Sequence, residues 1–279
     1  MKTMKYAFVC LVLAVTSLFQ MQAASAAAPN ILDGQGSYKI YYGAPNNRIL
    51  AQLGSYDFVI IEPYHYSSEQ IKQIQENGTL VFGYISTMEA ANWNTVLMAK
   101  MEPGDFFYRG GEKVRYTQWD SYLMDIASVH YRQVLMDEIK MQIAEKGFDG
   151  IFLDTVGDID DEHGNNITVL NEQRQGMKEL LEGIKQQYPS MALIQNWGFE
   201  TLKTTTAPYV NAIMWENFNY RAVAKDAWSL NRIKDLQQLQ QSYGLEVLTV
   251  SFAQQAQSAQ FAKKHGFIHY HAGRGYDRW

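Results

Sequence analysis

The chain has 279 residues, of which 47% are hydrophobic and 19% charged, and its formal net charge is −5. A chain of this length and apolar content buries one large core, which excludes a disordered protein, a collagen and a coiled coil. It shows no basic patch or arm, so nucleic-acid binding is not expected. The single cysteine, Cys10, excludes a disulfide scaffold and a cysteine-ligated zinc site.

The first 26 residues have the features of a secretory signal peptide. Lys2 and Lys5 precede an apolar run, and an A-S-A cleavage site follows at 24–26. The run is shorter than the roughly 20 residues that span a bilayer, which makes an uncleaved membrane anchor the weaker alternative. The sequence therefore predicts a signal peptide at 1–26 and a secreted domain at 27–279, with no stable membrane insertion after cleavage.

Short apolar, β-branched runs bounded by turn residues recur along the mature chain and predict β-strands. Eight such runs lie at residues 38–43, 56–63, 80–86, 150–155, 192–197, 212–218, 246–253 and 267–273. Most are apolar almost throughout, as expected of parallel strands buried on both faces. Helical patterns lie between them at 67–78, 130–146, 172–188, 231–243 and 254–264.

Eight strands that alternate with helices in about 250 residues match the (β/α)8 barrel in number and size. The alternative is a doubly wound open sheet, which often has a glycine-rich first turn, and no G-x-G-x-x-G or G-x-x-x-x-G-K motif occurs. No internal repeat or linker interrupts the chain. The prediction is therefore a single-domain α/β protein, a (β/α)8 TIM barrel, with an elaborated loop at 92–122 over the barrel mouth.

Polar residues end several predicted strands, at the edge where TIM barrels carry their function. Glu62, Asp154 and Glu216 each follow apolar residues, Asn196 ends the fifth strand, and Glu89 lies just beyond the third. Carboxylates are costly to bury, so their recurrence at strand ends indicates a function.

Asp154 and Glu216 form the strongest candidate pair, because only one strand separates the two strands that carry them. Neighbouring strands lie ~4.8 Å apart, so these two backbones are ~10 Å apart and inward-leaning side chains bring the carboxylates to ~5–5.5 Å. That separation suits a retaining glycosidase with a nucleophile and an acid/base, whereas a wider gap suits inversion. The alternative for each residue is a structural carboxylate in a salt bridge at the base of a loop.

Three segments resemble glycoside hydrolase family 114: G-Y-I-S-T-M-E-A at 83–90, G-F-D-G-I-F-L-D-T-V at 147–156, and Trp215-Glu216. The resemblance covers nearly the whole mature chain, and the second segment is its most specific part. This family consists of (β/α)8 endo-α-1,4-polygalactosaminidases, including the hydrolase domains of Pel-type biofilm systems. The resemblance implies that Asp154 is the nucleophile, that Glu216 is the acid/base, and that the substrate is a cationic amino-sugar polymer.

Three positions depart from the motifs of that family. Met88 stands where the family usually has glycine, Ala91 where it has a second acid, and Gly157 where it often has an aspartate, with Asp158 following. The departures at Met88 and Ala91 support an alternative, a catalytically inactive barrel that binds a polysaccharide of the cell envelope or biofilm matrix.

Aromatic and polar side chains near the predicted mouth are the candidates for substrate contact. Sugar rings stack on aromatic faces, and a protonated amino sugar adds a cation–π attraction of roughly 0.5–2 kcal/mol. The predicted contacts are Tyr42, Glu62, Tyr84, Glu89, Asn196, Trp197 and Tyr270. The alternatives are core filling for the aromatics, a loop-capping role for Asn196 and a helix N-terminal position for Glu89.

Two segments resemble metal sites and fail the tests for them. The acidic segment at 158–164 has His163 where an EF-hand needs glycine and Val169 where it needs glutamate, so a solvated acidic loop is expected. His269 and His271 share one face of the eighth strand, but metal-dependent barrel hydrolases normally carry such a pair on the first strand.

The sequence therefore predicts a secreted, monomeric, endo-acting glycoside hydrolase without metal or cofactor. The predicted reaction is cleavage of α-1,4-linked galactosamine-rich polysaccharide, with retention of the anomeric configuration.

Overall fold

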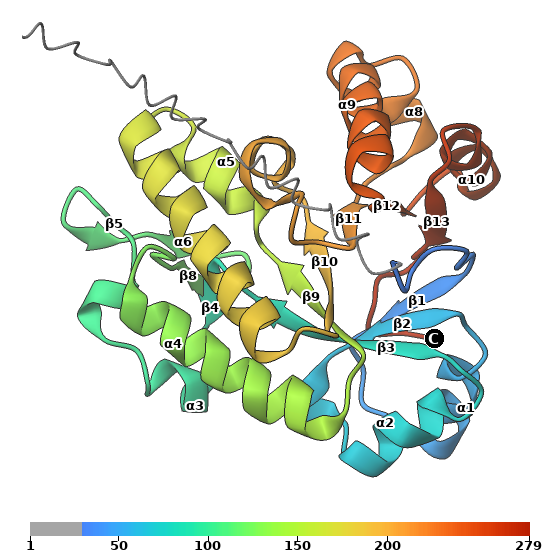
Figure 1. Ribbon diagram of the computed structural model, residues 1–279, viewed down its shortest axis with the longest axis horizontal. Coiled ribbons are helices and arrows are strands. Elements are labelled where there is room, and N and C mark those ends of the chain that lie inside the picture. The colour runs from blue at the N-terminus through green and yellow to red at the C-terminus, as the bar shows by residue number, and fades with distance from the viewer. Residues whose placement is uncertain (1–29) are drawn as a thin grey trace, which may run out of the picture.

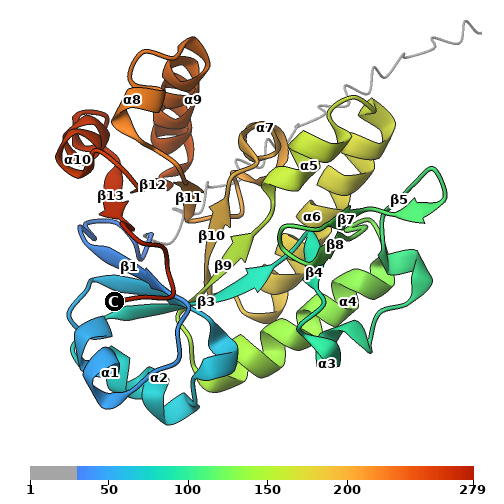
Figure 2. The same ribbon diagram turned by 180° about the vertical axis from the view of Figure 1, so that it is seen from behind.

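The structure is a computed structural model that describes residues 30–279, and the predicted signal peptide at 1–26 lies outside the described residues. Its centre is an eight-stranded sheet in which all neighbouring strands run parallel (Figures 1 and 2). In spatial order the strands are β1 (Tyr38–Tyr41), β2 (Phe58–Ile61), β3 (Leu80–Ser86), β9 (Gly150–Asp154), β10 (Ala192–Asn196), β11 (Ala212–Trp215), β12 (Glu246–Ser251) and β13 (Ile268–His271). Spatial order follows chain order, and all eight predicted strands are confirmed.

The sheet curls until its edge strands β1 and β13 approach each other, which gives a nearly closed barrel. No hydrogen-bonded ladder joins these two strands in the described part of the chain. Tyr38 of β1 bridges the seam instead: its hydroxyl donates to the Thr249 carbonyl at 2.9 Å, and its ring packs against Tyr270 at 5.5 Å between centroids. The predicted TIM barrel is thus confirmed, and the doubly wound open sheet is wrong.

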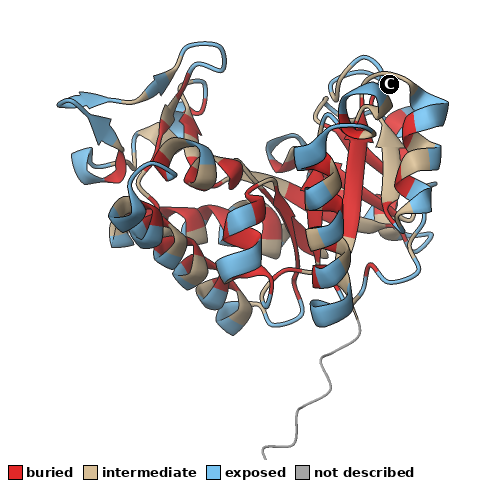
Figure 3. Cartoon of the chain, turned by 90° about the horizontal axis from the view of Figure 1, so that it is seen from above, coloured by how far each residue is buried: buried red, intermediate tan, exposed pale blue. Residues whose placement is uncertain are grey.

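Alternate strand residues point into the barrel and fill it. This inner cluster contains Tyr38, Ile40, Phe58, Ile60, Phe82, Phe152, Ile194, Met214, Leu248 and Val250, all buried. The residues between them point outward and pack under the helices in a larger cluster. Figure 3 shows the buried residues concentrated in the strands and on the inner sides of the helices. Burial on both faces explains why these strands lack hydrophobic alternation in the sequence.

Helices surround the barrel and leave its mouth open. The longer ones are α1 (Asn47–Leu53), α2 (Ser68–Gln75), α4 (Val129–Glu138), α6 (Ile167–Gln187), α9 (Ala227–Tyr243) and α10 (Gln255–Lys264), and α7 (Phe199–Thr201) and α8 (Tyr220–Val223) are short. The predicted helix at 130–146 starts as α4 and continues through a π-helical turn, Ile139–Ile143, and a 3-10 turn, Ala144–Lys146. Within residues 30–279, none of the helices has both the length and the apolar character needed to cross a bilayer.

The insertion between β3 and α4 lies beside the mouth, as predicted, but it is not a loop. It contains an antiparallel sheet and a hairpin, with one short helix. These elements are β4 (Glu89–Ala91), β8 (Ser121–Leu123) and β7 (Arg115–Tyr116) in the sheet, β5 (Tyr108–Arg109) and β6 (Glu112–Lys113) in the hairpin, and α3 (Thr95–Met98). Figure 1 shows this insertion on the side of the barrel opposite β12 and β13.

The acidic segment after β9 is a helix, α5 (Gly157–His163), and the predicted solvated loop is wrong. Ile159 is fully buried, and His163 packs its ring against Phe107 at 4.5 Å between centroids. Asp160 accepts hydrogen bonds from the backbone N–H groups of Glu200 and Thr201 in α7, at 2.9 and 3.0 Å. The segment is helical because of these tertiary contacts, which its acidic composition does not reveal.

Candidate active site

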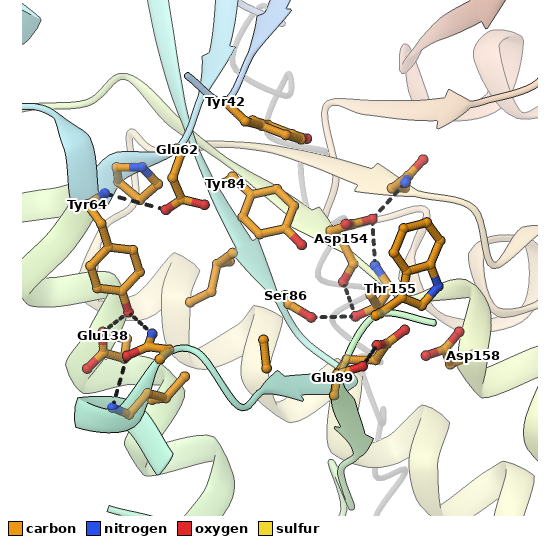
Figure 4. Close-up of a pocket in the computed structure, with 18 of the residues that line it drawn as sticks. Tyr42, Glu62, Tyr64, Tyr84, Ser86, Glu89, Glu138, Asp154, Thr155 and Asp158 are labelled. Atoms are coloured by element: carbon orange, nitrogen blue, oxygen red, sulfur yellow. Dashed lines mark hydrogen bonds between the residues drawn. The ribbon is translucent and has the colours of Figure 1, made fainter. Parts of the chain in front are cut away.

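The carboxyl ends of the strands open into a cavity of about 690 Å3. Its volume lies in the range of sites that enclose a ligand. Among the residues predicted from the sequence, those lining the cavity are Tyr42, Glu62, Tyr84, Glu89, Asp154, Asn196, Trp197 and Glu216. Figure 4 shows Tyr84 between Glu62 on one side and Asp154 on the other. The structure thus brings eight of the nine predicted residues together.

Tyr270, the ninth, does not line this cavity. Its hydroxyl accepts a hydrogen bond from Lys39 Nζ at 2.8 Å, and its ring packs on Tyr38, so it fills the seam between β13 and β1. Because Tyr270 lies in the last strand, the sequence suggested that its side chain points into the barrel mouth. It fills the space between the unpaired edges of β13 and β1 instead.

Asn196, at the end of β10, holds the two candidate carboxylates together. Its Nδ2 donates to Asp154 Oδ1 at 2.7 Å and to Glu216 Oε2 at 2.9 Å. Because one nitrogen bonds both, these two carboxylate oxygens lie no more than about 5.6 Å from each other. The predicted meeting of Asp154 and Glu216 across one strand is therefore present, with an amide between them.

The two carboxylates lie in different surroundings. Asp154 Oδ1 also accepts the N–H of Thr155 at 2.8 Å. Glu216 is largely buried, and burial together with the charge of Asp154 raises its pKa, while hydrogen bonds from Tyr276 and Asn196 partly oppose the rise. Burial and then the charge of Glu216 raise the pKa of Tyr276 far above its usual range, so this phenol is a hydrogen-bond donor to Glu216 Oε1.

The backbone after each of these strands has an uncommon conformation. Thr155, Trp197 and Asn217 have positive φ values of 64°, 54° and 59°, although none is glycine. Each directly follows one of the three polar residues, Asp154, Asn196 or Glu216. Such conformations cost on the order of 1 kcal/mol or more and persist where the surroundings enforce them. The left-handed residue ends each strand immediately after its last polar residue, and that polar side chain therefore lies at the mouth.

Thr155 also connects the end of β9 to the segment that leads from β3 into the insertion. Its Oγ1 accepts the N–H groups of Thr87 and Met88 at 3.1 and 2.8 Å. The Met88 side chain is fully buried in the outer core, so its departure from the family motif changes the packing rather than the cavity. Ala91, by contrast, lines the cavity at the position of a family acid.

A second group of carboxylates lies beside Asp154. Glu89 accepts a hydrogen bond from Ser121 Oγ, and burial raises its pKa. Burial and then the charges of Glu89 and Asp154 raise the pKa of Asp158 to about 8. Asp158 Oδ2 is buried and makes no hydrogen bond to a described residue. Glu89 and Asp158, which lie together in Figure 4, are therefore close acids with few donors.

The opposite side of the cavity contains Glu62 and a hydrogen-bonded network. Burial raises the pKa of Glu62 to about 7, partly opposed by the Tyr64 N–H and the charge of Lys146. The Tyr64 hydroxyl donates to Glu138 Oε2 at 2.6 Å, and Lys100 Nζ lies 2.5 Å from Glu138 Oε1. Glu138 is thus neutralised by a partner, whereas Glu62 has weaker compensation.

The cavity is acidic. The carboxyl groups that line it belong to Glu62, Glu89, Glu138, Asp154, Asp158, Asp161 and Glu216. No lysine, arginine or histidine is among the described residues that line it. Closely placed acids without cationic partners destabilise one another unless a ligand supplies positive charge.

The sequence matches the model of glycoside hydrolase family GH114 over residues 20–279. The chain belongs to glycoside hydrolase family 114. The protein is therefore a glycoside hydrolase, and the resemblance seen in the three sequence segments is confirmed. No curated protein shows a significant match to the sequence.

Solved structures share the fold of this GH114 protein. The glycoside hydrolase domain of PelA from Pseudomonas aeruginosa is 20% identical, with a TM-score of 0.69, and the match covers 88% of this chain and 97% of that chain. Aspergillus fumigatus Ega3, solved in complex with galactosamine, is 14% identical, with a TM-score of 0.67 and coverage of 88% and 94%. The α-galactosidase TtGalA from Thermus thermophilus is 11% identical, with a TM-score of 0.54 and coverage of 84% and 58%.

Among the lining residues that were not predicted, those that could contact a substrate or a carboxylate include Trp93, Trp119, Asp158 and Tyr276. Asp158 was assigned to a solvated loop, whereas it lies in the first turn of α5, close behind the strand end that carries Asp154. Trp93 and Trp119 belong to the insertion, where the sequence has no clear periodicity. Tyr276 follows the last strand, and no sequence pattern points to it.

The histidine pair of β13 is engaged within the protein. His269 Nε2 and His271 Nδ1 each lie 3.0 Å from Ser251 Oγ, and His269 Nδ1 lies 2.9 Å from Thr249 Oγ1. In residues 30–279, no group of three or more His, Cys, Asp or Glu side chains has the arrangement of a metal site.

Proposed function

We propose that this protein is a secreted, monomeric, endo-acting hydrolase of α-1,4-linked, galactosamine-rich polysaccharide, and that it acts with retention. The observation that carries the proposal is the acidic cavity, which seven carboxyl groups line and which no described lysine, arginine or histidine lines. A polymer of protonated amino sugars supplies the missing positive charge. The similar fold of Ega3, which binds galactosamine in its solved structure, supports the same substrate class.

The spacing of the carboxylates supports a double-displacement mechanism. Both bond the same amide nitrogen, so their facing oxygens lie no more than about 5.6 Å apart, which suits retaining enzymes better than the roughly 6.5–9.5 Å between the carboxyl groups of inverting ones. Glu216, whose pKa is raised, donates its proton to the glycosidic oxygen as the bond to the anomeric carbon breaks. Asp154 attacks that carbon and forms a glycosyl ester. Glu216 then takes a proton from water, whose oxygen attacks the same carbon and releases Asp154.

The Glu89 and Asp158 pair supports recognition of the amino group. Burial raises the pKa of both carboxyl groups, and the charge of Glu89 adds to the rise at Asp158. An ammonium group between them neutralises this charge and offers a donor to Asp158 Oδ2, which is buried without a partner among the described residues. An N-acetylated sugar lacks this charge, so the pair favours deacetylated residues.

Exposed aromatic side chains support binding of a long chain. Trp93 is 64% exposed and Trp119 69% exposed, and both line the cavity at the side of the insertion. Indole faces stack on sugar rings, so these residues extend the binding surface beyond the bond that is cleaved. Extended contact on one side of that bond is expected for cleavage within a chain.

One observation keeps the inactive polysaccharide-binding barrel as a second candidate: Ala91 lines the cavity where the family usually has an acid. The two functions are separated by incubating the protein with deacetylated α-1,4-galactosamine polymer, its fully N-acetylated form and polygalacturonate. We expect new reducing ends and short oligomers, identified by mass, from the deacetylated polymer and fewest from polygalacturonate. Binding without new reducing ends would favour the second candidate.

A further inference from the structure

The C-terminal segment at 272–279 connects the two edges of the barrel. It leaves β13 and passes the end of β1, where the Tyr42 N–H donates to the Tyr276 carbonyl at 2.8 Å. Its last residue, Trp279, packs against Tyr41 at 5.8 Å between ring centroids and lies 5.0 Å beneath Lys39 Nζ. Because no ladder joins β13 to β1 among the described strands, this segment, here called the C-terminal strap, fastens the seam of the barrel.

The strap also delivers a side chain to the candidate acid/base. The Tyr276 hydroxyl donates to Glu216 Oε1, and its ring contacts Tyr42 and Phe252 at 5.4 and 5.8 Å between centroids. Tyr276 thus packs against two aromatic rings, and its backbone is bonded to Tyr42 just after β1. Its orientation depends on the strap rather than on a strand or a helix.

The hydrogen bonds of Glu216 identify the oxygen that carries its proton. Asn196 Nδ2 is a donor only, so it contacts Oε2 favourably when that oxygen bears no proton. A protonated Glu216 therefore carries its proton on Oε1, the oxygen next to Tyr276. A phenol hydroxyl both donates and accepts, so Tyr276 remains a partner of Oε1 in either protonation state.

We propose that Tyr276 is a positioning residue for the acid/base and that the C-terminal strap, anchored by Trp279, holds it in place. This inference rests on the proposed role of Glu216. The titratable groups that face Glu216 are Asp154 from β9, Tyr38 and Tyr42 from β1 and its end, and Tyr276 from the strap. Asp154 raises the pKa of Glu216, whereas the Tyr276 hydrogen bond lowers it.

Replacing the phenol tests the proposal through the pH dependence of catalysis. Tyr276→Phe removes a hydrogen bond that stabilises the Glu216 carboxylate, so the pKa of Glu216 rises by about one unit. A general acid works in its protonated form, and the alkaline limb of the kcat profile therefore moves to higher pH. We expect kcat to fall about tenfold to a hundredfold because Oε1 is no longer held, with KM nearly unchanged.

Two other variants separate positioning from general effects on the fold. Tyr209→Phe is the matched control, because the Tyr209 hydroxyl donates to Glu182 Oε1 at 2.7 Å on the exposed surface, and its profile is expected to overlay that of the unaltered protein. Trp279→Ala loosens the anchor without touching Glu216. It is expected to move the alkaline limb in the same direction as Tyr276→Phe, by a smaller amount, with circular dichroism unchanged.

A measurement without substrate separates this inference from the proposed function. The Glu216 carboxyl carbon is titrated by 13C NMR in the labelled protein and assigned by its loss in Glu216→Gln. A higher Glu216 pKa in Tyr276→Phe and Trp279→Ala supports the strap, even if no polysaccharide is hydrolysed, in which case only the proposed function fails. Titration curves of both variants that overlay the curve of the unaltered protein would overturn the inference while leaving the function intact.

Discussion

The two groups of carboxylates in the cavity differ in how their charges are compensated. Asp154 and Glu216 share the amide hydrogens of Asn196, and Glu216 also accepts a hydrogen bond from Tyr276. Glu89 and Asp158 lie next to them, yet Glu89 has only Ser121 as a hydroxyl donor and one oxygen of Asp158 has no described partner. Both carboxylates of the first group thus have side-chain donors, whereas one carboxylate oxygen of the second group has none among the described residues.

This difference in compensation suggests that the two groups have different roles in the same cavity. A carboxylate pair with fixed donors is held in a single geometry before substrate arrives, as acid–base chemistry requires. A pair that lacks donors is destabilised in the free protein and gains most from a cationic ligand. In the proposed function, the first group therefore performs the chemistry and the second selects the substrate. The predictions below test that division, beginning with the largest effect.

Removing either member of the first pair should abolish hydrolysis. Asp154→Asn lacks the nucleophile, and Glu216→Gln lacks the transferable proton, while both keep the shape of the side chain. We expect kcat to fall by about a thousandfold or more in each, with unchanged circular dichroism and retained binding of substrate. Turnover close to that of the unaltered protein in either variant would remove that residue from its role.

Loss of the Asn196 amide, which bonds both carboxylates, should lower kcat by the next largest amount. Asn196→Ala frees both side chains, and we expect kcat to fall about a hundredfold through lost positioning. Gln173 is a matched control, because this buried amide bonds Ile126 and Asp125 outside the cavity, at 3.1 and 2.7 Å. Gln173→Ala should lower the melting temperature but not the kcat of the folded protein. Equal losses of kcat in both variants would contradict a specific role for Asn196.

The second group should control binding rather than turnover. The pKa of Asp158 is about 8, so its carboxyl group is mostly protonated at about pH 6.5, and a bound ammonium shifts it to the charged form. Binding of a galactosamine oligomer to Glu216→Gln should therefore release protons, as measured by calorimetry in buffers of different ionisation enthalpy. Adding Asp158→Asn should suppress this release and weaken binding about tenfold.

The N-acetylated oligomer is the matched ligand for that experiment, because it has the same ring and no ammonium group. It should bind weakly to both variants and release no protons. Proton release that persists in the Asp158→Asn protein would assign the titrating group to another acid, such as Glu62, whose pKa is about 7.

The exposed indoles should have the smallest effect, and only on long substrates. Trp93→Ala and Trp119→Ala each remove one stacking surface, so each is expected to raise the KM for the polymer about fivefold. The KM for short oligomers should stay unchanged. Trp228 is the control: it is 50% exposed but packs on Phe199 and Trp215, away from the cavity lining. A similar change in Trp228→Ala would show that the effect is not specific to the cavity.

The barrel and its central pair were predictable from the sequence for one physical reason. A strand buried on both faces is a continuous apolar run, and a polar residue that ends it stands out, as Asp154 and Glu216 do. Tyr276, Trp93 and Trp119 lie in segments without periodicity, so their positions are set by the folded barrel alone. Asp158 was missed because Asp160 makes α5 helical by binding the backbone of α7, a contact between segments 40 residues apart.

Real-time NMR of the first product formed tests the central claim most directly, since it reports the stereochemistry that the carboxylate spacing sets. The account predicts that hydrolysis of α-1,4-galactosamine oligomers first releases the α-anomer, which then mutarotates, because Asp154 and Glu216 lie too close for direct attack by water. Initial release of the β-anomer would contradict it and would require a water between these two side chains.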